Sequence, residues 1–463
     1  MTKLNPAPLH CHGQWSALDG WSTAYEMAQR ALDIGAPGIA LTDHGNCCGH
    51  LEFGKTVQDA GLKPVFGIEL YHGLKTTPDR KRDQAHLIAL AMNDKGLRNL
   101  WRLVNQTGRN DHFHHVGRVF WEDIENINEG ILFTSGCALG LVPREIVNGD
   151  YTSLNRYLDI LKDNFAIEIS TYPASNKFAD EGEDEAFNTQ IYNEALVSIA
   201  QERGLMITYG DDGHYSFPDQ FVYHDAYIAR QTNQSVYTPI EERKMYHPPN
   251  AVVIKDIEMI YNNLSYLPQN IVDEALQNAN WIVENATAQL PEIRRHLPVY
   301  LPSKSPWCDP KEKKLSPEEL FIELVTKGIY ERYGEEPSDE VWERVFYEVE
   351  TLIRDGIHHY FLMGWDEMKI ADSLGIERGP GRGSSGGSIV SYALGITDVC
   401  PLHYGLIFER FWNSGRVDGF PDIDSDFSRA RRGEMIEALK DRWGRDKVLA
   451  IGTTGYLKTK NGY

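Results

Sequence analysis

Short apolar runs alternate with helix-period segments through about the first 215 residues of the chain. The helix-period segments lie at 22–32, 94–106 and 187–204. The apolar runs lie at 38–41, 64–66, 87–92, 131–133, 165–169 and 205–208. Apolar runs of this length between helical segments are typical of buried strands, so the pattern predicts an α/β domain built by β/α alternation.

Polar residues gather where these apolar runs end. His44 follows the first run, Glu69 the second and Cys137 the fourth, and His214 comes shortly after the last run. His86 immediately precedes the third run. In β/α barrels the chemistry is assembled at one end of the sheet, so we expect these separated side chains to converge on one pocket.

A helix-period pattern without strand signals begins after residue 316. The segment 270–287 predicts a helix that closes the first domain, and the proline-containing stretch 297–316 predicts a linker. We therefore place a first domain at residues 1–285 and a second at 286–463. The second domain contains predicted helices at 317–333, 340–355, 361–374 and 389–394, with a glycine-serine loop at 379–388.

Composition agrees with a globular protein of two domains. The 463 residues are 41% hydrophobic and 24% charged, and no apolar run reaches the roughly 18 residues of a membrane span. The first residues lack the charged-then-apolar pattern of a secretory signal. The six cysteines form no CxxC pair, which favours reduced thiols. We expect a cytoplasmic protein that does not enter a membrane.

The net charge of −21 argues against a generally basic nucleic-acid-binding surface, because phosphate repels an acidic one. The balance reverses locally. From residue 429 to residue 463 the chain has nine Lys/Arg and four Asp/Glu. This basic stretch follows three closely spaced aspartates, and the combination suits a polyanionic partner.

Nine side chains with nitrogen, oxygen or sulfur donors lie near the predicted strand ends. They are His10, His12, Asp19, His44, Glu69, His86, Cys137, Asp212 and His214. One ion cannot use nine donors, whereas two or three divalent ions can, and a mixed donor set suits Zn, Mn or Fe better than Mg. Such a site activates water and neutralises phosphate, so the set predicts phosphoester hydrolysis.

Two other stretches are predicted to be surface loops. The tract His112, His114 and His115 lies in the loop 111–116 without evident acidic partners, which argues against a ligand role. The stretch 174–186 is rich in acidic residues and glycine.

The order of the nine donors resembles that of the PHP (polymerase and histidinol phosphatase) domain, as found at the start of bacterial replicative DNA polymerase III α-subunits. The matching motifs are His10-x-His12, Asp19-Gly20, Thr42-Asp43-His44-Gly45, Gly67-Ile68-Glu69, His86-Leu87, Thr134-Ser135-Gly136-Cys137 and Asp212-x-His214. The resemblance implies a distorted β/α barrel with a trinuclear metal site. In some members this site performs 3′–5′ exonucleolytic proofreading, and in others the ligands are lost and the domain is structural. Every ligand position is retained here, which favours an active site.

The second domain places a glycine-serine loop ahead of alternating acids. Asp422, Asp424 and Asp426 would share one face of a strand, where they repel one another unless cations lie between them. A solvated acidic strand edge is the alternative. The loop 379–388 offers backbone N–H groups at the start of a helix, which favours a bound phosphate.

This loop and these acids closely resemble the palm of the same α-subunits, an α+β nucleotidyltransferase-like domain. The matching stretches are 379–388, 391–398, 401–402, 406–411, 421–424 and 444–446. The resemblance assigns two catalytic Mg²⁺ to Asp422 and Asp424, and makes Asp426 a neighbour. The residues implied in binding the dNTP triphosphate are Gly381, Arg382, Gly383, Ser384, Ser385 and Arg410.

The palm is incomplete in these residues. In the family a third catalytic aspartate follows the thumb, and the sequence reaches Tyr463 where the thumb would begin. The first hypothesis is therefore the N-terminal portion of a replicative DNA polymerase, encoded as a split gene in a bacterial cell or by a phage and completed by a second polypeptide. Its partners would be dNTP and DNA, either as primer-template or as a single-stranded 3′ end. The alternatives are a stand-alone PHP-type exonuclease or phosphoesterase and a non-catalytic structural module.

Overall fold

The computed structural model describes residues 4–73, 84–173, 188–292, 297–413, 421–445 and 447–448. They fall into two compact units, one through Glu292 and one in the residues that follow. Each unit is described by itself. The predicted loop at 174–186 lies outside the described residues. Among the described residues, no helix is both long and apolar enough to cross a membrane.

The first unit is built on a six-stranded sheet with the order β1-β2-β3-β6-β7-β8. Its strands are β1 (Gly38–Leu41), β2 (Lys63–His72), β3 (Ala85–Ala91), β6 (Ile131–Thr134), β7 (Phe165–Ser170) and β8 (Ile207–Gly210). β3 is antiparallel to both of its neighbours, and the other pairs are parallel. The carboxyl ends of five strands and the amino end of β3 therefore lie at one edge of the sheet.

An extended segment at residues 8–12 joins the two outer strands of this sheet. On the β1 side, the Thr42 N–H donates to the Cys11 carbonyl at 2.8 Å. On the β8 side, the His12 N–H donates to the Gly213 carbonyl at 2.7 Å. The sheet thus closes on itself, and the predicted distorted β/α barrel is confirmed.

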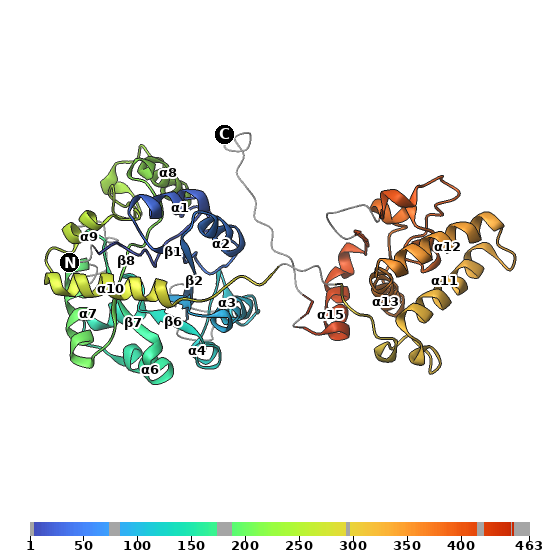
Figure 1. Ribbon diagram of the computed structural model, residues 1–463, viewed down its shortest axis with the longest axis horizontal. Coiled ribbons are helices and arrows are strands. Elements are labelled where there is room, and N and C mark those ends of the chain that lie inside the picture. The colour runs from blue at the N-terminus through green and yellow to red at the C-terminus, as the bar shows by residue number, and fades with distance from the viewer. Residues whose placement is uncertain are drawn as a thin grey trace. The chain divides into compact units, whose positions relative to one another are not determined.

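Helices surround the strands of the first unit (Figure 1). They are α1 (Ala24–Asp33), α2 (His50–Asp59), α3 (Asp94–Thr107), α4 (Trp121–Asn126), α5 (Leu141–Ile146), α6 (Thr152–Leu161), α7 (Thr189–Arg203), α8 (Phe221–Gln231), α9 (Ile257–Asn263) and α10 (Gln269–Asn285). Two short strands, β4 (Phe113–His114) and β5 (Val116–Gly117), form a separate hairpin. Because helices cover the sheet, strands β1, β7 and β8 are buried at every position, which explains why most of their residues are apolar.

Strand β2 is longer than the sequence pattern predicts. The prediction ended at residue 66 because glycine usually interrupts a strand, but β2 continues through Gly67 to His72. A Cβ atom at position 67 would lie 2.7 Å from the Leu90 side chain of β3, so glycine permits the close packing of the two strands. As a result, Glu69 lies within β2 and not after it.

The second unit is helical in its described residues. Its helices are α11 (Pro317–Tyr333), α12 (Asp339–Arg354), α13 (His358–Leu374), α14 (Ile389–Ala393) and α15 (Arg432–Trp443). α11 begins with a capping box, in which the Ser316 hydroxyl accepts a hydrogen bond from the Glu319 N–H and the Glu319 carboxylate accepts one from the Ser316 N–H. The predicted helix at 317–333 coincides with α11.

The sheet expected for an α+β palm is not formed among these described residues. Residues 421–426 belong to no strand: the Asp426 carbonyl accepts from the Gly379 N–H at 2.9 Å, next to an isolated bridge between Arg378 and Phe427. A strand requires a partner along its length, and the described residues supply one bridge only. Asp422 and Asp424 therefore lie on an irregular segment.

Close packing of α11 against α14 depends on a glycine. A Cβ atom at Gly328 would lie 2.0 Å from the Ala393 carbonyl oxygen, which no side-chain rotation relieves. Gly433, in α15, has no atom within 4 Å of such a Cβ.

We predict that Gly328→Ala destabilises the second unit by about 1–3 kcal/mol, because α14 must move to admit the methyl group. Gly433→Ala is the matched control, and we expect it to be neutral or to stabilise by up to about 1 kcal/mol. Calorimetric unfolding of the two variants checks this. Equal melting behaviour would contradict the packing argument.

Candidate metal centre

The Glu69 carboxylate lies at the centre of the predicted donor set and is fully buried. Its Oε2 atom is 3.0 Å from His12 Nε2 and 3.0 Å from His44 Nδ1. The same oxygen is 3.5 Å from His10 Nε2, and Oε1 contacts Nδ1 of His86. β3 runs against its neighbours, so His86 at its amino end reaches the same edge as the carboxyl ends of the other strands.

Two aspartates complete the histidine cluster. Asp212 Oδ1 lies 3.3 Å from Nε2 of both His10 and His12. Asp19 Oδ2 lies 3.3 Å from His44 Nε2, and Asp19 Oδ1 lies 3.4 Å from His214 Nε2. The loops that carry Asp19 and Asp212, although far apart in the sequence, thus meet at the histidine cluster.

The donor atoms form three overlapping groups, in each of which they lie within 4.8 Å of one another. The groups are His12, His44 and His214; His10, His12, Glu69 and Asp212; and Glu69, His86 and Cys137. Cys137 Sγ is 3.5 Å from His86 Nδ1, and Asp19 adjoins the first group. The structure therefore brings all nine predicted residues together.

Several of these buried donor atoms have no hydrogen-bond partner. They are His10 Nε2, His12 Nε2, Asp19 Oδ1, His44 Nδ1, Glu69 Oε1 and Glu69 Oε2. Buried polar atoms are almost always paired, because an unpaired one costs about 1–3 kcal/mol. Nitrogen lone pairs and carboxylate oxygens that face one another without hydrogen bonds fit divalent cations.

Hydrogen bonds on the far side of two histidines orient them toward this space. His10 Nδ1 lies 2.7 Å from Glu168 Oε1, and His12 Nδ1 lies 3.1 Å from Ser16 Oγ. The Ser16 hydroxyl donates in turn to Asp43 at 2.6 Å. If each Nδ1 carries the proton, each Nε2 presents a lone pair, which is the usual arrangement behind a metal-binding histidine.

The electrostatics of the metal-free cluster are those of a buried ion-pair network. Burial alone would lower the pKa of His10, but Glu168 and Asp212 raise it well above its ordinary value. Burial would likewise lower the pKa of His44, and Glu69 and Asp19 raise it. Conversely, burial would raise the pKa of Glu69, but His86 and His44 hold it well below its ordinary value.

Two neighbours of the cluster were not predicted from sequence. Glu168 was visible as an acid within an apolar strand run, and its role emerges only from the contact with His10. Tyr71 follows Glu69 by two positions on β2 and therefore shares its face. Its ring stacks over His44 with centroids 6.0 Å apart.

The histidine tract outside the cluster does have acidic partners, which corrects the prediction from sequence. His112 is buried, with Nδ1 2.8 Å from Asp111 and Nε2 3.0 Å from Asp123. Asp123 lies in α4 and Asp111 is the preceding residue. Both ring nitrogens of His112 are thereby used in local bonds.

In the second unit, the glycine-serine loop adjoins the alternating acids. A Cβ atom at Gly383 would lie 2.7 Å from Asp424 Oδ2, so the carboxylate rests directly against the loop. Arg382 Nη1 lies 3.3 Å from Asp426 Oδ1, and both side chains are exposed. Asp422 is also exposed.

The residues expected to bind the triphosphate differ in how far they are exposed. Ser384 and Arg410 are exposed, whereas Ser385 is buried and its hydroxyl donates to the Arg382 carbonyl at 3.0 Å. Gly381 has a φ of +131°, a conformation that glycine favours.

The start of α14, where a phosphate was expected, already holds a protein carboxylate. Glu348, fully buried, accepts from the Ser388 hydroxyl at 2.7 Å and from the Ile389 and Val390 N–H groups at 3.2 and 3.3 Å. Arg344 Nε donates to it at 2.6 Å. Glu348 therefore takes the place at this helix start that the sequence assigned to a phosphate.

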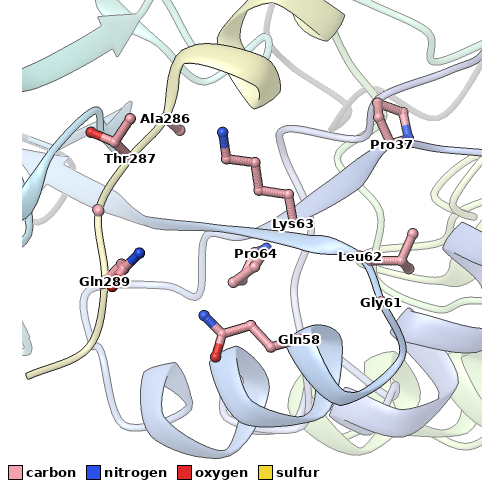
Figure 2. A pocket seen from close by; sticks show the side chains of 10 residues that line it. Pro37, Gln58, Gly61, Leu62, Lys63, Pro64, Ala286, Thr287 and Gln289 are labelled. Atoms are coloured by element: carbon pink, nitrogen blue, oxygen red, sulfur yellow. The ribbon is translucent and has the colours of Figure 1, made fainter. Parts of the chain in front are cut away.

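A shallow pocket of about 330 Å³ lies at the other end of β1 and β2 (Figure 2). Two of its lining residues are Pro37, which precedes β1, and Lys63, which begins β2, whereas His44 follows β1. No histidine or carboxylate lines it. The pocket is thus separate from the donor cluster.

Comparison with known families defines the class of the protein. The PHP domain matches residues 8–172, and the bacterial DNA polymerase III alpha NTPase domain matches residues 319–463. The first unit is thus similar to a PHP domain, and the second to a polymerase III alpha NTPase domain.

Its sequence corresponds to the N-terminal part of DNA polymerase III alpha subunits. That of Borreliella burgdorferi is 33% identical over 98% of this chain and 38% of the relative, and that of Chlamydia trachomatis is 29% identical over 98% and 39%. The chain thus spans less than half the length of these relatives. A solved structure described as a metal-dependent phosphoesterase of Bifidobacterium adolescentis aligns with a TM-score of 0.32 and 12% identity, over 57% of this chain and 96% of its own.

We predict that the metal-free first unit is most stable between about pH 5 and pH 6.5. The raised pKa values of His10 and His44 mean that their contribution is full below the ordinary value of 6.5 and is lost as the pH rises through the folded values. The lowered pKa of Glu69 adds stability above its ordinary 4.5, which is lost at lower pH. Melting of chelator-treated protein from about pH 5 to pH 9 measures this. A melting temperature that increases toward pH 9 would be contrary to it.

Proposed function

We propose that the first unit is a metal-dependent phosphodiesterase that removes nucleotides from the 3′ end of single-stranded DNA. The observation that carries this proposal is the convergence of buried, unpaired nitrogen and carboxylate atoms on Glu69. The nine residues from His10 to His214 would hold two or three divalent ions, of the Zn, Mn or Fe type. Bound ions would activate water and neutralise phosphate charge.

The chain's own residues have separate tasks in this proposal. Glu69 and Asp212 are each shared between donors, and therefore set the spacing of the cluster. Glu168 and Ser16 orient the rings of His10 and His12 from behind. Tyr71 borders the same space, and its phenol is suited to donate a hydrogen bond to a phosphate oxygen.

DNA is the proposed substrate because the chain corresponds to part of a polymerase subunit. A 3′ end produced by polymerisation is what a hydrolytic site on such a subunit would meet. Such a protein would act in the cytoplasm of a bacterial cell.

We predict that the metal-loaded chain shortens single-stranded DNA from its 3′ end, and that His12→Ala and Asp212→Asn each lower kcat/KM by at least about 100-fold. Loss of an outer hydrogen-bond partner alone typically costs about 10–100-fold, and these residues would be direct ligands. Gel assays with 3′- and 5′-labelled oligonucleotides, with Mn²⁺ or Zn²⁺, measure the effect.

His114→Ala is the control for this experiment, because His114 belongs to the tract outside the cluster. It should retain wild-type activity. Unchanged activity in both ligand variants would refute the assignment. A wild type that holds metal but hydrolyses nothing would favour a structural role for the barrel.

A second candidate function is a contribution to DNA synthesis, favoured by the contact of Asp424 with the loop at Gly383. Asp422 and Asp424 would hold two Mg²⁺, and Arg382 and Ser384 are exposed for contact with a dNTP triphosphate. A third carboxylate and a surface that grips the duplex would have to come from a further segment or a second polypeptide.

We predict that the 463-residue chain alone does not extend a primer, because two carboxylates do not position metals, primer and dNTP together. Primer extension with Mg²⁺ and all four dNTPs tests this. Templated extension by the purified chain would show the expectation to be wrong. Extension that appears only after a candidate C-terminal polypeptide is added would support completion by a partner.

A further inference from the structure

Helix α8 reaches the metal centre through a histidine outside the nine donors. His224 is 1% exposed, and its Nε2 lies 3.6 Å from Asp19 Oδ1. Neither atom has a hydrogen-bond partner. The His224 ring also lies 5.6 Å from the ring of His214, the other neighbour of Asp19 Oδ1.

The same helix holds the loop that carries Asp19. The Trp21 ring stacks on Tyr223 with centroids 4.8 Å apart, and Tyr227 meets it edge-on at 5.0 Å. The Trp21 N–H donates to the His214 carbonyl at 2.8 Å. α8 therefore fixes the position of Trp21, two residues after Asp19.

The loop itself has little conformational freedom at this point. Leu18 has a φ of +63°, a region that side-chain-bearing residues rarely adopt. A Cβ atom at Gly20 would lie 2.1 Å from the Gly13 carbonyl oxygen. A backbone held in such a conformation requires support from its surroundings, and α8 supplies it.

We propose that His224 is a positioning residue for the metal centre. Its Nε2 faces Asp19 Oδ1 at 3.6 Å, so that in the metal-loaded centre its N–H would donate to this oxygen and hold the carboxylate where Asp19, His44 and His214 would together bind one ion of the cluster. This role rests on the proposed function. It differs from the role of the nine donors because His224 acts through Asp19 and binds no ion itself.

The test compares His224→Ala with His224→Gln, whose side-chain nitrogen takes the position of Nε2. Each protein is loaded with Mn²⁺ or Zn²⁺, dialysed against graded chelator and assayed for bound metal by mass spectrometry. We expect His224→Ala to bind one ion about 10–100-fold more weakly than wild type, and His224→Gln to restore most of that affinity. Hydrolysis should follow the same order, with the loss in kcat exceeding the change in KM.

His50→Ala is the matched control. His50 is also buried in the barrel, but its ring nitrogens bond to the Gly67 carbonyl at 2.9 Å and to Trp101 Nε1 at 3.1 Å, away from the donor set. This variant should melt at a lower temperature and keep every ion. If His224→Ala holds all ions at wild-type affinity, or if His224→Gln behaves like His224→Ala, the positioning role is overturned. A wild type that binds no metal overturns the proposed function, and this role with it.

Discussion

Carboxylate oxygens and histidine nitrogens converge on the buried Glu69, and the architecture of the first unit depends on holding them there. Carboxylates and imidazoles so close together, without hydrogen bonds among their inner atoms, are stable only if protons or cations neutralise them. The barrel has to hold these atoms in place against that cost. The curled sheet suits the task, because its inner strands are each paired on both sides and segment 8–12 links the residues that follow its two outer strands.

Two departures from simple β/α alternation make the cluster geometrically complete. The reversal of β3 brings the start of that strand, with His86, to the edge where the other strands end. The extended segment 8–12 bonds to both outer strands and carries His10 and His12 inward between them. Without the reversal of β3 the cluster would lack His86, and without the extended segment it would lack His10 and His12.

Regular periodicity predicted most of the first unit, and local motifs predicted its donors. The strand at 38–41 and the helix at 317–333 were predicted at their observed bounds, since each has an uninterrupted pattern and a clear start signal. Glu168, Tyr71 and His224 escaped prediction as site residues. Their roles come from contacts with residues far away in the sequence, or from the face of the strand or helix on which they lie. Sequence alone does not show which face is turned toward the metal centre.

The second unit shows where motif and environment diverge. The loop at 379–388 looked from sequence like a site for phosphate at a helix start, yet Glu348 from α12 takes that position. The residues next to Glu348 in the sequence do not reveal that its carboxylate caps α14, because Ser388 at the start of that helix lies 40 residues away. Among the described residues the expected strand at Asp422–Asp426 is not formed, because pairing requires a second strand and they supply none.

The donor cluster around Glu69 and the segment with Asp422 and Asp424 therefore differ in how firmly the surrounding protein holds their side chains. In the barrel, Glu69 and His86 lie within strands of the sheet, and the outer atoms of His10 and His12 are already bonded to Glu168 and Ser16. In the second unit, Asp422 is exposed and pairs with no strand among the described residues, so the sheet-like support found in the barrel is not present around it there. A site of the first kind can select ions by its own geometry, whereas a site of the second kind acquires its geometry from ions, nucleotide and further protein. The proposed hydrolysis therefore calls only on groups of the first unit, whereas the proposed part in synthesis calls on groups from elsewhere.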